Sequence, residues 1–371
     1  MTDNVQNVQS VGLPDERPPA NAVGPLAWLR ANLFNTWYNA ILTVLVLALL
    51  ASAIPPFVNW LLIRAHGFDA SSTVCRQDAG GACWGFISEK LRFIMFGMFP
   101  WDEQWRPLVT ICVIIALLVV SCDRRFWKPW LGLIWAAGLG LVAVLMWGGV
   151  LGLTYVENTL WGGLPLTLIL SVIGLAVAFP LAILLALGRR SNMPAVKVLC
   201  VTYIELIRGV PLISLLFMAS VMLPLFLPNG VSIDKLLRAQ IAFIMFAAAY
   251  MAEAIRGGLQ AIPKGQYEAA DAMGLSYWQK TGLIILPQAL RLVIPPLVNT
   301  FIGFFKDTSL VIIIGLYDLL GTAKAALSDP SWRGFYREAY LFIGVIYWVF
   351  CYSMSKYSQK LERDLNRSHR H

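Results

Sequence analysis

Two long stretches of this sequence contain no charged residue. Residues 129–155 and 164–187 carry no Asp, Glu, Lys or Arg, and only 13% of the 371 residues are charged, about half the fraction of a soluble domain. A helix of about 20 apolar residues crosses the hydrocarbon of a bilayer, and it pairs its backbone groups within the segment, as lipid demands. The chain is therefore predicted to be an all-α membrane protein.

Eight apolar segments reach or approach this length. They predict about eight transmembrane helices. The segments span residues 39–63, 107–122, 129–155, 164–187, 199–227, 239–252, 292–320 and 335–354.

The distribution of Lys and Arg predicts the orientation of these helices. If the N-terminus is cytoplasmic, the inner pieces hold more than half of the 29 Lys and Arg, and the short outer loop 156–163 holds none. An even number of crossings then places both termini in the cytoplasm. We attribute the net charge of +8 to this bias. Nucleic acid is not an expected partner, because no basic run is interleaved with aromatics on a soluble domain.

The long loop at residues 64–106 is predicted to lie outside. Between Trp84 and Trp105 it has apolar residues at helical spacing, which suits either a helix lying on the outer leaflet or a segment packed on the other helices. Cys75 and Cys83 lie in the same loop and would form a disulfide if that face is oxidising. No metal site is expected, because His66 is the only His near them.

A polar stretch separates the sixth and seventh apolar segments. It reads Glu-Ala-Ala at 268–270, then Gly274, and ends with Ile-Ile-Leu-Pro at 284–287. This spacing resembles the EAA loop of the membrane permease subunits of binding-protein-dependent ABC importers, where the cytoplasmic ATPase grips the membrane subunit. The resemblance implies a coupling loop at residues 264–287, and the Lys and Arg distribution independently predicts that this loop is cytoplasmic.

The residues of this coupling loop predict a compact, rigid knob. A helix of small residues ends at Gly274, which needs a left-handed backbone, and a second helix runs from about Tyr277 to Leu286 and stops at Pro287. The alternative is an ordinary helical hairpin. The predicted ATPase-coupling residues are Tyr267, Glu268, Ala269, Ala270, Met273, Gly274 and Leu275.

Further stretches resemble the permeases for polar amino acids. They are Thr167–Leu187, Tyr203–Phe217 with Val210 where Thr is common, Ala248–Ala270 and Asn299–Leu310. The resemblance implies a five-helix permease core at residues 156–358. A three-helix extension at 36–155 precedes it, as in the long permeases for general L-amino acids or for glutamate, glutamine, aspartate and asparagine. Residues 1–35 are expected to be a flexible cytoplasmic tail and 359–371 a second cytoplasmic tail.

The family resemblance implies a permease subunit that carries out no covalent chemistry. The sequence has no P-loop, so this chain is expected to hold no cofactor, and ATP and Mg are expected on partner ATPase subunits. Also implied are a second permease subunit in a heterodimer, a periplasmic amino-acid-binding protein, membrane lipid and a location in the bacterial inner (plasma) membrane.

Charged residues at membrane depth are costly and therefore candidates for a substrate pathway. Glu205 and Arg208 are three residues apart and can pair, whereas Lys306 and Asp307 interrupt the seventh segment. Structural ion pairs are the alternative for these groups. The candidate pathway residues are Glu205, Arg208, Glu253, Arg256, Asn299, Lys306, Asp307, Thr308 and Ser309.

Two other classes of protein are weighed against the permease. An ion-gradient-driven secondary transporter or channel would have no use for an EAA loop. A membrane-embedded enzyme would need a polar catalytic cluster, but His66, His369 and His371 are scattered and no paired-acid motif is present.

Overall fold

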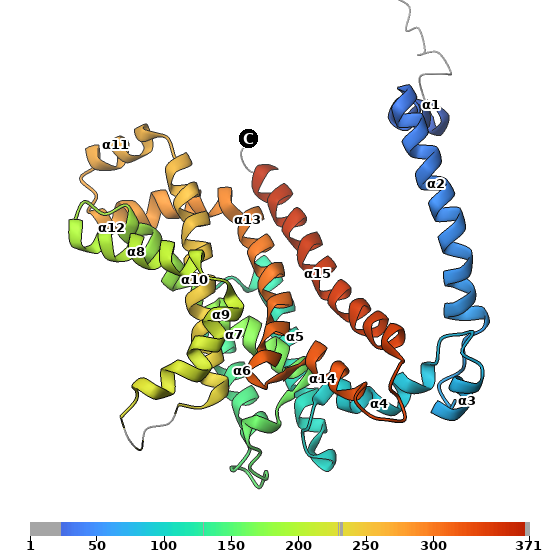
Figure 1. The fold of residues 1–371 in the computed structure, drawn as a ribbon. Helices are drawn as coiled ribbons and strands as arrows, with labels where there is room; N and C mark the ends of the chain where they lie inside the picture. The colour runs from blue at the N-terminus through green and yellow to red at the C-terminus, as the bar shows by residue number, and fades with distance from the viewer. Residues whose placement is uncertain (1–23, 129, 229, 231–232, 368–371) are drawn as a thin grey trace, which may run out of the picture. The chain divides into compact units, whose positions relative to one another are not determined.

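The chain folds into helices that are long enough to cross a membrane. The structure, a computed structural model (Figure 1), describes residues 24–128, 130–228, 230 and 233–367. In this described part, seven helices pass the length and hydropathy requirements for a span, or eight if the bent pair formed by residues 194–209 and 212–226 counts as one. The predicted all-α membrane protein with about eight spans is thus confirmed.

The chain divides into two compact units. The first comprises the described residues through His66 together with Asp78–Ala82, and the second comprises Gly67–Gln77 and the described residues from Cys83 onward. The helices of the first unit are α1 (Pro25–Asn32), α2 (Trp37–Val58) and the π-helix η1 (Asn59–Ile63).

The first unit contains more helix than the sequence predicted. Pro25 starts α1 at its first turn, where a proline costs no hydrogen bond, so residues 25–32 are helical and not a flexible tail. The rest of that predicted tail, residues 1–23, lies outside the described residues. Pro55 and Pro56 lie inside α2, and the π-helix follows directly, as expected where prolines interrupt the i→i−4 ladder.

The second unit holds all the remaining elements. Before the polar stretch they are α3 (Ser72–Gln77), α4 (Trp84–Phe96), η2 (Trp101–Glu103), α5 (Trp105–Cys122), η3 (Arg124–Phe126), α6 (Trp130–Trp147), η4 (Asn158–Leu160), α7 (Gly163–Arg189), α8 (Pro194–Gly209), α9 (Leu212–Phe217), η5 (Met218–Met222), η6 (Leu223–Phe226) and α10 (Lys235–Ala261). From there on they are α11 (Lys264–Ala272), α12 (Tyr277–Gln279), η7 (Lys280–Ile285), α13 (Leu286–Asp307), η8 (Thr308–Ile314), the two-residue strand β1 (Tyr317–Asp318), α14 (Leu319–Ala326) and α15 (Tyr336–Arg367).

Helices α7 and α10 form the centre of this unit and pack extensively against each other. On α7, the fully buried residues Ala178, Ala182 and Ala186 recur at every fourth position. Small residues on one face allow two membrane helices to approach closely. Helix α13 packs on α10 in the same way, since a Cβ on Gly258 would lie 2.7 Å from the carbonyl oxygen of Ala289.

The fifth apolar segment, expected at residues 199–227, is broken. Helix α8 and the helical run from Leu212 to Phe226 are bent by 103° relative to each other. Pro211 forces the residue before it away from helical geometry, and Val210 indeed has an extended backbone, with φ −106° and ψ 133°. The proline therefore turns one predicted helix into two.

The loop at 64–106 contains α4, which packs on the core of the second unit. Phe86 and Ile94 are fully buried, and Phe86 stacks edge-on with the buried Trp332 at 5.7 Å. Lys90 on α4 donates to Asp329 at 2.6 Å. Of the two arrangements that the sequence left open, the structure has the packed one.

The predicted extension at 36–155 does not form a compact unit of its own. Helices α5 and α6 belong to the same unit as the helices from α7 onward. Arg106 of α5 is fully buried and donates to the carbonyl oxygens of Leu145 at 2.6 Å and Thr154 at 2.9 Å.

At the C-terminal end of the described chain, α15 continues to Arg367. The expected tail at 359–371 is therefore helical as far as residue 367, and residues 368–371 lie outside the described residues.

Candidate functional site

The first helix of the coupling loop, α11, ends in a left-handed glycine. Gly274 has φ +73° and donates its N–H to the carbonyl oxygen of Asp271 at 2.9 Å, while Leu275 N–H reaches that of Ala270 at 3.3 Å. This pair of bonds satisfies the last carbonyls of the helix and reverses the chain. Gly274 therefore has the left-handed backbone at the end of the first helix that the sequence predicted.

The sequence predicted that the second helix stops at Pro287. In the structure the helix continues past this residue. Ser276 and Gln279 form a reciprocal capping box, with bonds of 3.0 and 3.4 Å, and the helical run then continues from Tyr277 to Ile314. A π-helical turn at η7 precedes the proline. This wider turn, together with the position of Pro287 in the first turn of α13, accommodates a residue that lacks an N–H.

The coupling loop exposes large apolar side chains. Met273 is 65% exposed and Trp278 69% exposed, and Tyr277 packs edge-on against Trp278 at 5.3 Å. Among the predicted coupling residues, Glu268, Ala269 and Gly274 are also exposed, Leu275 is half-buried, and Ala270 is fully buried. We missed Tyr277 and Trp278 as contact candidates, although two adjacent aromatics in a polar loop were a visible signal.

Tyr267 connects the coupling loop to the membrane helices. Its hydroxyl donates to the carbonyl oxygen of Leu259 in α10 at 3.0 Å and accepts from Arg190 Nη1 at 2.9 Å. Arg190, at the end of α7, also donates to the Leu259 carbonyl at 2.7 Å. Tyr267, one of the predicted ATPase-coupling residues, is half-buried and forms these bonds within its own chain.

A group of four charged residues, here called the charged junction, joins α7, α8 and α10. Arg189 Nη1 lies 2.7 Å from Glu205 and 3.4 Å from Glu253, and Arg256 Nε lies 2.9 Å from Glu253. The junction thus holds two positive and two negative charges. The expected pairing of Glu205 with Arg208 is wrong, because a tertiary contact with Arg189 takes Glu205 instead.

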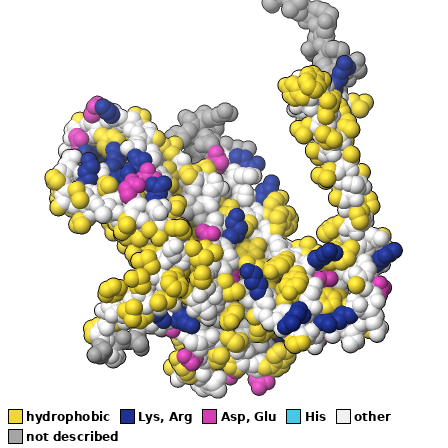
Figure 2. Space-filling model, in the orientation of Figure 1, with side chains coloured by type: hydrophobic (Ala, Val, Ile, Leu, Met, Phe, Trp, Pro, Cys, Tyr) yellow, Lys and Arg dark blue, Asp and Glu magenta, His cyan; other side chains and the backbone are white. Residues whose placement is uncertain are grey.

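Arg208 lies beside this junction with a different partner. Its guanidinium lies 5.5 Å from the centre of the Tyr250 ring, and its Nε is buried without a hydrogen-bond partner in the described part of the chain. Figure 2 shows Lys and Arg gathered with Asp and Glu over the part of the view that α8, α11 and α12 occupy in Figure 1.

The remaining pathway candidates lie elsewhere. Lys306 and Ser309 line a cavity of about 270 Å³ together with Tyr340 and Tyr347 of α15. Asp307 is half-buried and forms no salt bridge with any residue that the structure describes. Thr308 is buried and donates to the carbonyl oxygen of Phe305 at 2.8 Å, and Asn299 is exposed.

The structure therefore separates the nine pathway candidates into two groups and leaves Asn299 outside both. Four lie at or beside the charged junction: Glu205, Arg208, Glu253 and Arg256. Four lie where α13 passes into η8: Lys306, Asp307, Thr308 and Ser309. Lys306 and Asp307 do not break the seventh segment: α13 runs through Asp307 and continues as a 3₁₀ turn.

Arg189 and Arg190 were not predicted as site residues. Their signal was a basic pair at the end of an uncharged segment, which predicted only the orientation of that segment.

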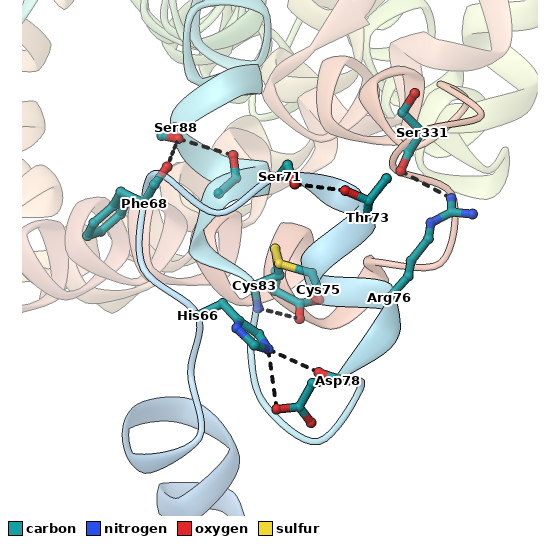
Figure 3. The surroundings of a disulfide bond; sticks show 12 residues. His66, Phe68, Ser71, Thr73, Cys75, Arg76, Asp78, Cys83, Ser88 and Ser331 are labelled. Carbon is teal, nitrogen blue, oxygen red and sulfur yellow. Dashed lines mark hydrogen bonds and ion pairs between the residues drawn. A yellow bond between two sulfur atoms is a disulfide. The ribbon is translucent and has the colours of Figure 1, made fainter.

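Cys75 and Cys83 form a disulfide in the structure, with their Cα atoms 5.9 Å apart (Figure 3). Nearby, Arg76 donates to the carbonyl oxygens of Pro330 and Ser331 at 2.6 and 3.1 Å. The backbone N–H of Cys83 donates to Glu338 at 3.1 Å. These bonds fix the disulfide loop to the segment between α14 and α15 and to the first turn of α15.

Comparisons with known proteins agree on one family. Residues 178–367 match the family described as binding-protein-dependent transport system inner membrane component. The inner membrane amino-acid ABC transporter permease protein YhdY of Escherichia coli (strain K12) is 50% identical over 352 residues, covering 93% of this chain and 94% of that protein.

A second relative is the glutamate/glutamine/aspartate/asparagine transport system permease protein BztC of Rhodobacter capsulatus, which is 41% identical over 420 residues, covering 95% of this chain and 96% of BztC. A chain in the crystal structure of an amino acid ABC transporter with histidines is 33% identical. The match covers 54% of this chain and 92% of that chain, with a TM-score of 0.49.

Proposed function

The chain belongs to the family of binding-protein-dependent transport system inner membrane components, and from this we infer that it is a permease subunit of an ATP-driven importer for polar L-amino acids. A permease of this family is a transport subunit and not an enzyme, because ATP is hydrolysed by partner subunits. Two full-length relatives are named as amino-acid or glutamate/glutamine/aspartate/asparagine permeases, which supports the substrate class.

The observation that carries this proposal is the geometry of the coupling loop. Gly274 reverses the chain between two helices, and the reversal presents Met273, Tyr277 and Trp278 to solvent. Exposed large aromatics and Met on a rigid element are typical of protein-binding surfaces. A cytoplasmic ATPase subunit is the partner that we propose for this surface.

The charged junction and Tyr267 would transmit the motion of the ATPase. A push on α11 reaches α7 through the Tyr267–Arg190 bond and reaches α10 through the Leu259 carbonyl. Arg189 lies between two carboxylates, Glu205 and Glu253. A shift of α8 against α10 can therefore change how this guanidinium divides its contact between the two carboxylates, while Arg256 keeps Glu253 paired, which would permit alternating access.

We propose that the cavity lined by Lys306, Ser309, Tyr340 and Tyr347 is part of the substrate pathway. An amino acid presents a carboxylate and an ammonium. Lys306 and the hydroxyls of Ser309 and Tyr340 suit the carboxylate. Asp307 is not part of the cavity lining but follows Lys306 in the chain and has no ion-pair partner among the described residues, so we propose that it receives the ammonium. The residues of the charged junction are already paired with one another and are less available to a solute.

We further propose the assembly and its orientation. The partners are ATPase subunits that bind ATP and Mg, a second permease subunit in a heterodimer, and a periplasmic amino-acid-binding protein. The chain itself would hold no cofactor. Its multi-span helices would lie in the bacterial inner membrane with both termini and the coupling loop in the cytoplasm.

Uptake into proteoliposomes tests this function. The chain is reconstituted with its ATPase, its second permease and its binding protein. Uptake of glutamate, glutamine, aspartate and asparagine is measured both with all ion gradients collapsed and with a proton or sodium gradient imposed. We expect uptake only with ATP and the binding protein. Uptake that persists without the ATPase and depends on a proton or sodium gradient would contradict the proposal and support a secondary transporter.

A further inference from the structure

Gly344 lies inside the membrane span of α15, at a position where the described structure does not require a glycine. A Cβ built there would have no described atom within 4 Å, apart from its chain neighbours and the nearby backbone of its own helix. Its φ does not lie in the left-handed region. Since glycine is the least favourable residue in a helix interior after proline, what this position offers is space.

The space beside Gly344 belongs to the cavity of about 270 Å³ that we assign to the substrate pathway. Tyr340, Gly344 and Tyr347 line it from one face of α15, each one helical turn from the next. The glycine therefore forms a notch between two tyrosines. Sites for drug-sized ligands begin at about 300 Å³, so this cavity suits one small solute such as an amino acid.

One wall of this notch is held in place by its neighbours. Tyr347 donates its hydroxyl to Asp318 Oδ2 at 3.0 Å, and its ring packs edge-on against Phe305 at 5.4 Å. Asp318 is fully buried, and its other oxygen accepts the N–H of Gly321 in the first turn of α14 at 2.8 Å. Because Tyr347 is fixed at both its hydroxyl and its ring, a side chain at position 344 would narrow the notch.

The walls of the cavity differ in polarity. Lys306 and Ser309 lie where α13 passes into η8 and supply a positive charge and a hydroxyl. Leu320 of α14 and Ile343, the chain neighbour of Gly344, add apolar surface. The carboxylate of a solute suits Lys306, whereas the methylene groups of its side chain suit the apolar wall and the notch.

We propose that Gly344 sets the size of the amino-acid side chain that this pathway admits. The inference rests on the proposed function, because it assigns a specificity-determining residue to the same cavity. The notch receives the methylene groups between the α-carbon and the terminal acid or amide of the solute. A side chain at position 344 fills that space and excludes glutamate more than aspartate, which has the same charge and one methylene fewer.

Uptake of this pair of amino acids tests the proposal in proteoliposomes that carry the complex with its ATPase, second permease and binding protein. ATP-driven uptake of glutamate and of aspartate is measured at concentrations that saturate the binding protein. Gly344→Val should lower the glutamate-to-aspartate ratio about tenfold or more relative to the wild type, as expected for one methylene in a closely fitting pocket. Gly344→Ala should lower the ratio by a smaller factor.

Gly140→Val is the matched control. Gly140 lies inside the span of α6 and has an equally open Cβ position, but it does not line the cavity, so its ratio should equal that of the wild type. If Gly344→Val does not assemble, Gly344→Ala decides the question, because alanine favours a helix more than glycine does.

An unchanged ratio in an assembled variant at Gly344 would overturn the proposal. So would an equal loss of both amino acids, which would indicate a purely structural role, or the same shift in Gly140→Val. A wild-type complex without ATP-driven uptake would instead contradict the proposed function itself, so the two failures are distinguishable.

Discussion

At the scale of single residues, one hydroxyl group links the coupling loop to the membrane helices. Tyr267 accepts a bond from Arg190 of α7 and donates one to the Leu259 carbonyl of α10. Because Arg190 also reaches that carbonyl, the three groups form a closed triangle. The loop is thereby held to two helices that belong to the centre of the fold.

We predict that Tyr267→Phe weakens coupling while the complex still assembles. The change removes two hydrogen bonds but keeps the ring in place, and a net loss of about 1 kcal/mol corresponds to about a fivefold change in an equilibrium. The measurement is amino acid imported per ATP hydrolysed. Tyr352→Phe is the control, because the exposed Tyr352 lies on α15, outside the coupling loop, and its hydroxyl has no hydrogen-bond partner in the described residues. An unchanged ratio in Tyr267→Phe would refute the transmission role.

Two of the three acids among the pathway candidates, Asp307 and Glu253, have different surroundings, which sharpens a second prediction. Asp307→Asn should reduce uptake about 10- to 150-fold, the effect of losing a contact with a charged ligand group. It should leave complex assembly intact, because Asp307 has no ion-pair partner to strand among the described residues. Glu253→Gln, by contrast, should reduce the amount of assembled complex, because Arg189 and Arg256 lose their shared carboxylate. The measurement is uptake divided by assembled complex. A wild-type ratio for Asp307→Asn would remove Asp307 from the pathway.

At the scale of elements, the sequence predicted where helices exist better than where they end or bend. Uncharged segments predict spans because burial in lipid leaves the backbone no alternative to a helix. Proline was harder to interpret. Pro211 breaks a helix because Val210 must be extended, whereas Pro287 starts α13 after a π-turn. Which of these happens depends on the neighbouring turn and not on the proline itself.

Some residues of the candidate site, but not all of them, could be predicted from the sequence. Gly274 could be identified because only a glycine adopts its backbone without strain. The charged junction could not, since Glu205 has a base three residues away in sequence and pairs instead with Arg189, sixteen residues away and on another helix. Local spacing indicates which pairs are possible, and the packing of α7 against α8 and α10 selects among them.

A further prediction concerns the disulfide between Cys75 and Cys83, which lies outside the predicted permease core at residues 156–358. Cys75 and Cys83 should be joined in protein taken from the native membrane, whereas Cys112, Cys122, Cys200 and Cys351 should be free thiols, as in the structure. Mass spectrometry of unreduced peptides, after alkylation of free thiols, would show a loss of about two hydrogen masses for the bridged pair. Alkylation of both Cys75 and Cys83 would contradict it.

At the scale of the whole molecule, the orientation in the membrane decides whether an ATPase can reach the coupling loop. Single cysteines introduced at Gly265, Gly80 and Gly230 in a background without the free cysteines should react with impermeant reagents from opposite sides. We predict labelling of position 265 from the cytoplasm and of positions 80 and 230 from the periplasm. External labelling at position 265 would reverse the topology and remove the coupling loop from the ATPase.

We infer that motion of the ATPase enters this chain through the knob around Gly274. A Cβ at Gly274 would have no described atom within 4 Å apart from those of its chain neighbours, so there is space for the first atom of a side chain. It does carry a left-handed backbone penalty of about 1 kcal/mol and would project into the partner. Gly265→Asp is the matched control, since it adds the same charge to the same loop at a position that is equally open and has no positive φ.

A decisive test is the number of amino acids imported per ATP hydrolysed in proteoliposomes. Each variant is compared at equal amounts of assembled complex. We predict that Gly274→Asp assembles but hydrolyses ATP with little or no uptake, or fails to retain the ATPase, and that Gly265→Asp resembles the wild type. Normal uptake per ATP in a well-expressed Gly274→Asp complex would show that the motion of the ATPase does not enter through this knob.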